Sequence, residues 1–172
     1  MKKVFIVILI PMIVCFVMTA SALAQNPDSL KTMLEKMTYD YAKAWCNKDM
    51  NFINETWAHD PDITCWGVMD SPRVVGWEGP NGVKAIYENS FSSMKEINFS
   101  ISEPLVKVAK DCNSAVITYY VTNNYVMNNG TKGSMTPRVT VVREHRGDKW
   151  LIIHSDATYS VQQAKEKKLG KK

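Results

Sequence analysis

Apolar residues recur at helical spacing in the segment that follows residue 25. Between residues 28 and 45 they share one helix face, at Leu30, Met33, Leu34, Met37, Tyr41, Ala44 and Trp45. Pro27 and Asp28 are typical of a helix start, and Asp49 can cap a short second helix that runs through Trp57. A third apolar stripe predicts a helix over 83–94.

The rest of the chain is rich in β-branched and aromatic residues, which predicts strands at 63–69, 74–77, 97–109, 115–127, 134–145 and 149–160. Asn129-Gly130 is a strong hairpin signal, and Pro137, which has no N–H, is expected at an edge, a bulge or a strand start. Helices segregated from antiparallel strands define an α+β fold, in which three N-terminal helices pack on a strongly curved, mostly antiparallel sheet of about six strands. We expect a pocket between the helices and the concave side of that sheet.

The first 24 residues have the pattern of a secretory signal peptide. Lys2 and Lys3 precede an apolar run over 4–18, and Ala22 and Ala24 occupy the small positions that signal peptidase recognises. The run is shorter than the roughly 20 residues that span a bilayer, so cleavage after Ala24 is favoured over an uncleaved membrane anchor. We therefore expect a periplasmic or extracellular protein with one domain, 25–161, and a Lys-rich flexible tail, 162–172.

The net charge of +4 comes from the ends of the chain. Removal of Lys2 and Lys3 leaves +2, and the tail contributes five Lys and one Glu, or +4, so the domain carries 2 − 4 = −2. No nucleic-acid partner and no stable membrane insertion after signal cleavage are predicted. The tail is interpreted as solvated and frayed, with attraction to anionic membranes or cell-envelope polymers as the alternative.

Three cysteines, Cys46, Cys65 and Cys112, remain once the signal peptide is removed. They are interpreted first as small buried hydrophobic residues. The alternative is one disulfide and one free thiol, with a pairing that the sequence does not define. No Cys or His spacing indicates zinc, and neither a metal nor a cofactor is predicted.

Polar residues alternate along the last hairpin. Arg138 and Thr140 share one face of a strand, and His154, Asp156 and Thr158 share one face of the next. Ionisable groups at such positions predict a cavity wall. His154 and Asp156 could act as a general acid/base pair, with Arg138 holding a carboxylate or an enolate-like oxygen. The alternative is a structural network in which Asp156 neutralises Arg138.

These motifs resemble the SnoaL-like domains of the nuclear transport factor 2-like superfamily over residues 28–160. The matching elements are Arg138-Val139-Thr140 and Trp150 followed four residues later by His154. The chain departs from the family's closing pattern, since Asp156 replaces a second His and Thr158 replaces Ser. The resemblance implies a cone-shaped fold, which hosts isomerases, cyclases, dehydratases and non-catalytic assembly modules, and a homodimer that pairs through the sheet.

Two further groups are candidate site residues. Trp66 and Tyr120 are candidates for an apolar ligand pocket with polar handles. His59, Asp60 and Asp62 form an acidic cluster that the resemblance places near a catalytic carboxylate, but the sequence H-D-P-D favours a turn.

Three functions follow from these patterns. The first is a secreted protein that binds a small, largely apolar ligand in its cone. The second is an enzyme of the isomerase, cyclase or dehydratase type that uses His154 and Asp156. The third is a non-catalytic dimeric assembly module.

Overall fold

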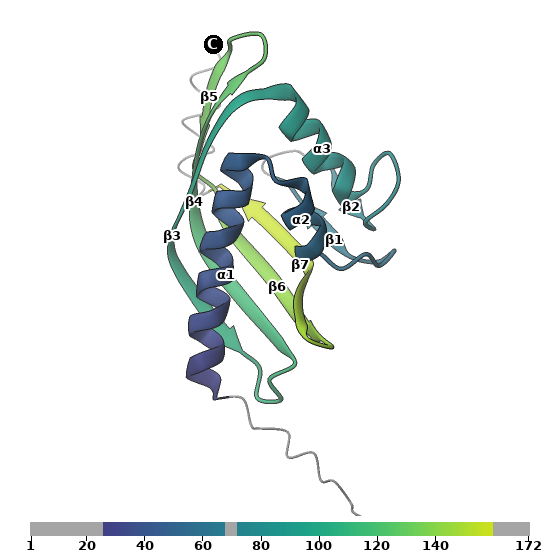
Figure 1. Ribbon diagram of the computed structural model, residues 1–172, viewed down its shortest axis with the longest axis vertical. Helices are drawn as coiled ribbons and strands as arrows, with labels where there is room; N and C mark the ends of the chain where they lie inside the picture. The colour runs from purple at the N-terminus through teal and green to yellow at the C-terminus, as the bar shows by residue number, and fades with distance from the viewer. Residues whose placement is uncertain (1–25, 68–71, 160–172) are drawn as a thin grey trace, which may run out of the picture.

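The computed structural model describes residues 26–67 and 72–159. The predicted signal peptide and Lys-rich tail lie outside these residues. The three predicted helices are present as α1 (Pro27–Asn47), α2 (Met50–Thr56) and α3 (Val83–Ser93). All three lie on the same side of the sheet, with α1 lying across its strands (Figure 1). No helix among the described residues is long and apolar enough to cross a membrane.

Local sequence explains where the first two helices begin and end. The Asn26 side chain accepts from the backbone N–H of Asp28, and Pro27 occupies the first turn, where a missing N–H leaves nothing unpaired. Lys48, with φ of 52°, ends α1 in the left-handed region. Asp49 caps α2 by accepting from the N–H of Phe52, so the predicted cap is confirmed.

The sheet has seven strands in the order β2-β1-β7-β6-β4-β3, and β5 pairs with β4 beyond the end of β6. The strands are β1 (Thr64–Trp66), β2 (Arg73–Val75), β3 (Met94–Val108), β4 (Ser114–Met127), β5 (Lys132–Met135), β6 (Arg138–Arg146) and β7 (Lys149–Thr158). Among the strands of the described residues only β1 and β7 pair in parallel, and an isolated bridge between Trp57 and Ile152 is also parallel. The fold is therefore the predicted α+β arrangement of helices on a mostly antiparallel sheet.

The predicted strand 134–145 is two strands in the structure. Pro137 separates β5 from β6 because it cannot donate to the ladder. This position immediately before β6 agrees with the expectation of a strand start. β5 and β6 consequently pair with different parts of β4, at Asn123–Val126 and Ser114–Tyr120 respectively.

The core lies between α1, α3 and the sheet. Along β4 the side chains alternate with period two, and Ala115, Ile117, Tyr119, Val121 and Asn123 are buried beneath the helices. We call this helix-covered side the inner face and the opposite side the outer face. Tyr120 and Val116 belong to the outer face and are exposed.

Candidate functional site

A cavity of about 310 Å³ lies between the helices and the inner face of the sheet. Helix α1 contributes Tyr41 and Trp45, and α3 contributes Ile86, Tyr87 and Ser90. The sheet contributes residues of alternate register, among them Tyr119, Val121, Asn123, Val139, Ser155 and Ala157. The volume is at the lower end of the roughly 300–1,000 Å³ typical of small-molecule sites.

Aromatic rings form one wall of the cavity. Trp45 stacks on Phe99 with ring centroids 5.1 Å apart and planes 10° apart. Phe91 meets the same indole edge-on at 5.2 Å, and Tyr87 lies 5.4 Å away. Such contacts fix Trp45 firmly, so the wall is formed by the packing itself.

The tyrosines supply polar groups to this largely apolar space. The hydroxyls of Tyr41 and Tyr87 share a short hydrogen bond, and Trp57 Nε1–H donates to the Tyr87 oxygen at 3.1 Å. Burial raises the pKa of Tyr41, Tyr87 and Tyr119. All three hydroxyls are therefore protonated at neutral pH and can donate as well as accept hydrogen bonds.

Two further lining residues have polar atoms without a partner. Trp45 Nε1 and Asn123 Oδ1 are buried and have no partner at hydrogen-bond geometry within the part of the chain that the structure describes, although the Trp45 N–H is close enough to the Tyr41 hydroxyl to lower the pKa of that group. The terminal torsion of Asn is soft, so its amide can turn toward the cavity. An unpaired buried polar atom costs about 1–3 kcal/mol, so a ligand with one acceptor and one donor would stabilise both residues.

Among the described residues that line the cavity there is no Asp, Glu, Lys, Arg or His. Its remaining ionisable group besides the tyrosines is Cys65. Burial, with a smaller effect of the Asp156 carboxylate, raises the pKa of the Cys65 thiol to about 11. The thiol is therefore neutral at physiological pH and is not an activated nucleophile.

The residues of the predicted cavity wall lie on the outer face instead. Thr140 pairs with Asp156 and Arg138 with Thr158, while their neighbours Val139, Ser155 and Ala157 line the cavity. The prediction that these five polar residues, His154 included, line the helix-covered pocket is therefore wrong. Their roles in catalysis or ligand binding stay predictions.

A β-bulge explains the reversal. Trp150 and Ile152 are buried on the inner face, and period two would place His154 beside them. However, Val142 pairs with His154 and Arg143 with Ile152, so Ile153 is an extra residue without an opposite partner. The bulge moves His154, Asp156 and Thr158 to the outer face.

The structure does bring most of the predicted site residues together, but on that outer face. Tyr120 pairs with Arg138, which pairs with Thr158, and Asp156 lies between Thr140 and Trp66. Trp66 stands at the rim, since it also lines the cavity while remaining exposed. The Oγ1 atom of Thr64 lies 2.7 Å from Nδ1 of His154, at hydrogen-bond distance. Within the described chain no ion pair joins Asp156 to His154 or Arg138.

The acidic cluster that begins at His59 belongs to a turn, as the sequence favoured. The His59 ring stacks on Trp77 at 4.7 Å and its Nε2 lies 2.8 Å from the carbonyl oxygen of Asn54. Asp60 accepts from Arg146 at the end of β6. No group of three His, Cys, Asp or Glu in the described ranges is arranged to hold a metal ion.

Sequence reasoning missed Arg143, which is buried beneath α1 with 2% of its surface exposed. Val139, Val141 and Arg143 alternate on one face of β6. The two valines therefore indicated which face is buried, and Arg143 continues their register. Arg143 lies close to Tyr41 and Tyr119, which also line the cavity.

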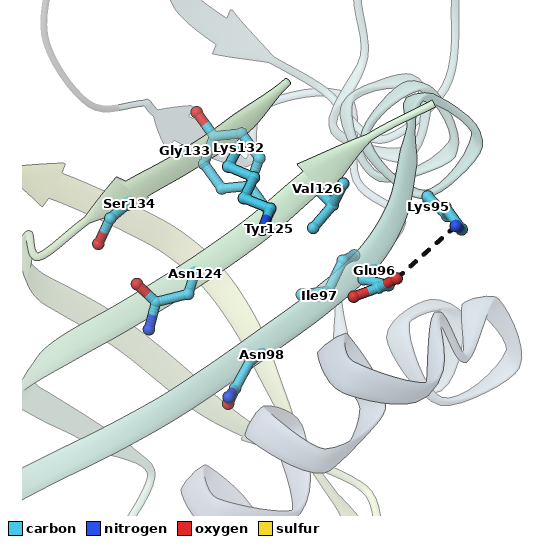
Figure 2. Close-up of a pocket in the computed structure, with 10 residues that line it drawn as sticks. All are labelled: Lys95, Glu96, Ile97, Asn98, Asn124, Tyr125, Val126, Lys132, Gly133 and Ser134. Carbon is cyan, nitrogen blue, oxygen red and sulfur yellow. Dashed lines mark ion pairs between the residues drawn. The ribbon is translucent and has the colours of Figure 1, made fainter. Parts of the chain in front are cut away.

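A second hollow is larger and more open. It lies where β5 extends the sheet and has a volume of about 1,100 Å³ (Figure 2). Its outward side chains are solvated, and Lys95 and Glu96 form only a loose pair at 3.9 Å. The Tyr125 ring covers Gly133, where a Cβ would lie 2.3 Å from the ring. This hollow lacks the enclosure of the inner cavity, which we take as the candidate ligand site.

None of the three described cysteines of the domain is joined in a disulfide. Cys46 is exposed, and Cys65 and Cys112 are half-buried. The alternative of one disulfide is therefore not realised in the structure. The interpretation as a buried residue is wrong for Cys46.

Together, the helices packed on one side of a mostly antiparallel sheet and the cavity between them define an α+β domain of the nuclear transport factor 2-like kind. The family model described as a SnoaL-like domain matches residues 34–161. The chain belongs to this SnoaL-like family, as the R-x-T and Trp-to-His motifs indicated. No curated protein matches the chain.

Solved structures agree on the fold. A nuclear transport factor 2-like superfamily protein from Salmonella enterica serovar Typhimurium is 15% identical with a TM-score of 0.69, over 79% of this chain and 96% of that chain. A candidate dehydratase of the same family from Streptomyces avermitilis is 15% identical with a TM-score of 0.67, over 78% and 99%. The association domain of the kinase CaMKII from C. elegans is 14% identical with a TM-score of 0.59, over 77% and 97%. At these identities the likeness concerns the fold alone.

Proposed function

We propose that this protein binds a small, largely apolar molecule in the cavity between its helices and its sheet. The observation that supports this most is an enclosed space with aromatic walls and tyrosine hydroxyls, lined by two residues with unpaired polar atoms. At about 30 Å³ per water molecule, the space corresponds to about ten waters. That volume suits a ligand of one ring or two small rings.

The sequence of residues 1–24 supports secretion, so the proposed site of action is the periplasm or the exterior of the cell. The candidate dehydratase among the similar structures makes catalysis an alternative. The described cavity lining holds no His or carboxylate, and His154 and Asp156 lie on the other face. Binding without chemistry is therefore the function that the geometry favours.

Titration with a neutral fluorescent compound of two small rings, 1-naphthylamine, tests the binding site. Ala157→Phe fills the cavity from β7, whereas Thr158→Phe adds the same ring on the outer face of the same strand. We expect the first variant to weaken binding at least tenfold and the second to bind like the wild-type protein. Equal affinity of Ala157→Phe and the wild-type protein, or no binding at all, would refute the proposal.

A second function, assembly through the outer face, is supported by exposed apolar side chains. Leu105 on β3 is 70% exposed, and Tyr120 on β4 is 52% exposed. Leu105 pairs with Thr118 on β4, and the exposed Val116 lies two residues from Thr118 on the same face of that strand. Contiguous apolar surface of this kind marks interaction sites, and association domains occur among the similar structures. We propose a homodimer that covers these residues.

Sedimentation velocity at micromolar concentration tests the dimer. The wild-type protein should sediment as a dimer and Leu105→Glu as a monomer, because a carboxylate in an apolar interface is costly to desolvate. Lys36→Glu introduces a carboxylate on the exposed side of α1, which lies on the opposite side of the sheet, and should remain dimeric. A monomeric wild-type protein would exclude assembly of this kind.

A further inference from the structure

Arg143 is a buried cation without an anionic partner. Its Nη1–H donates to the Trp150 carbonyl oxygen at 2.8 Å, and its Nε–H has no partner among the described residues. No described carboxylate forms an ion pair with it. A buried charge normally has a partner, because desolvation without one is expensive. The absence of a partner in the described chain points to an anion that comes from outside it.

The guanidinium lies one layer behind the floor of the ligand cavity. A space of about 10 Å³, at the lower limit of what can hold one water molecule, is lined by Arg143 together with Thr38, Tyr41 and Tyr119. Tyr41 and Tyr119 line this small space and the ligand cavity alike. The charge of Arg143 therefore acts on the cavity through one layer of tyrosine side chains.

No ionisable group described around Arg143 neutralises it at physiological pH. The groups that interact with its charge are Tyr119 from β4, Tyr41 from α1 and Tyr87 from α3. Burial raises the pKa of each tyrosine. At Tyr119 the charge of Arg143 lowers the pKa, but by less than burial raises it. All three hydroxyls are neutral, so the floor of the cavity has a net positive potential.

The hydroxyl pair also leaves one donor unused. Tyr41 and Tyr87 carry two O–H groups and share one hydrogen bond, and Trp57 already occupies an acceptor position on Tyr87. Whichever hydroxyl donates within the pair, the other retains its hydrogen for a ligand. A donor next to a positive potential in a space of low dielectric favours a negatively charged oxygen.

We infer that the ligand binds as an anion with its charge on a single oxygen, a phenolate or enolate placed at Tyr41 and Tyr119 in front of Arg143. The aromatic walls hold the rest of a planar ring, and no carboxylate of the described lining repels the charge. A carboxylate ligand would gain more from direct contact with a cation, which this cavity does not offer because the tyrosines intervene. The inference rests on the proposed ligand cavity and adds the charge of what it binds.

Binding of three nitroaromatic probes of similar size tests the inference: 4-nitrophenol, 4-nitrobenzyl alcohol and 4-nitrobenzoate. The absorbance of bound 4-nitrophenol reports its ionisation directly. We expect bound 4-nitrophenol to ionise at a pH at least one unit lower than 4-nitrophenol in solution. We also expect 4-nitrophenolate to bind at least tenfold more tightly than 4-nitrobenzyl alcohol or 4-nitrobenzoate. A bound phenol that ionises at the same pH or higher would overturn the inference.

Variants separate the charge of Arg143 from its packing. Arg143→Met should abolish the preference for phenolate and leave the affinity for the alcohol unchanged, and Arg143→Lys should retain part of it. Arg146→Met, on the same strand, should behave like the wild-type protein. If Arg143→Met unfolds, Tyr119→Phe keeps the cation and should weaken phenolate binding selectively.

The possible failures are distinguishable. If the alcohol binds and phenolate is not preferred, the ligand cavity stands and the anion is wrong. If 4-nitrobenzoate binds most tightly, the cavity prefers a carboxylate, and the inference of a charge on a single oxygen is wrong. If none of the three probes nor the neutral naphthylamine binds, the proposed function fails as well.

Discussion

Replacing Arg143 by Met is expected to stabilise the protein. The side chain is 2% exposed, and burial, only partly offset by the neighbouring tyrosines, lowers the pKa of Arg143 to about 10. At 1.36 kcal/mol per pKa unit, this depression corresponds to about 3 kcal/mol against the charged form in the folded state. Loss of the hydrogen bond to the Trp150 carbonyl oxygen offsets about 1–2 kcal/mol of that gain. The net expectation is a rise of about 1–2 kcal/mol in the free energy of unfolding.

The pH dependence has a defined sign. The folded state holds the Arg143 proton less tightly than the unfolded state does, so between pH 10 and the ordinary pKa of arginine the unfolded state binds more protons. The destabilisation is therefore complete below about pH 10 and diminishes as the pH rises further. The stability difference between Arg143→Met and the wild-type protein should be constant from pH 6 to 9 and should shrink above pH 10.

Urea unfolding followed by tryptophan fluorescence measures the effect, and an unchanged m-value shows that the two proteins unfold comparably. Arg146→Met is the matched control on the same strand. Arg146 is 38% exposed and pairs with Asp60 and Glu144, so its loss should destabilise by at most about 1 kcal/mol and less at high salt. Destabilisation of Arg143→Met by more than 1 kcal/mol would refute the description of Arg143 as an uncompensated charge.

Three further predictions concern other parts of the fold. Gly82→Ala should destabilise by roughly 2 kcal/mol or more, because its Cβ would lie 2.4 Å from a backbone oxygen, whereas Gly130→Ala, with φ of 84° and open space, should lose only about 1 kcal/mol; urea unfolding of both variants checks the order. At pH 8 a thiol reagent should modify the exposed Cys46 much faster than Cys65, whose thiol has a pKa raised to about 11 by burial; equal rates would contradict the burial of Cys65. Asp60→Asn should destabilise by at most about 1 kcal/mol, and 1 M NaCl should remove most of the difference from the wild-type protein.

Patterns of sequence that depend on local chemistry predicted the fold well. The helix starts at Asn26 and Asp49 and the break at Pro137 follow from caps and from a missing N–H, which act within a few residues. The order of helices and strands then restricts the architecture to one side of an antiparallel sheet. The division of the predicted strand 134–145 also follows from Pro137, although the sequence did not show that its two halves would pair with different parts of β4.

The site was harder to predict because a cavity wall can be polar or apolar, so the alternation along β6 does not state which of its two faces lines the cavity. The polar series with Arg138 and Thr140 and the apolar series with Val139 and Val141 are equally regular. The bulge at Ile153 then reverses the register of β7 after Ile152. Such a reversal depends on the pairing of two strands and leaves no clear mark in either strand alone.

The unpaired polar groups of the interior are concentrated around the cavity. Four buried side-chain atoms in the described chain lack partners, and three of them belong to Trp45, Asn123 and Arg143, which line the cavity or lie just behind its floor. Each makes the empty protein less stable than an apolar residue would, and functional sites are where such violations are expected. A ligand that satisfies these groups would raise the free energy of unfolding, by about 2.7 kcal/mol when its free concentration is a hundred times its Kd. Arg143→Met should therefore change two measurements in opposite directions, since it raises the stability of the empty protein and lowers the stabilisation by a phenolate. A purely structural arginine would change only the first.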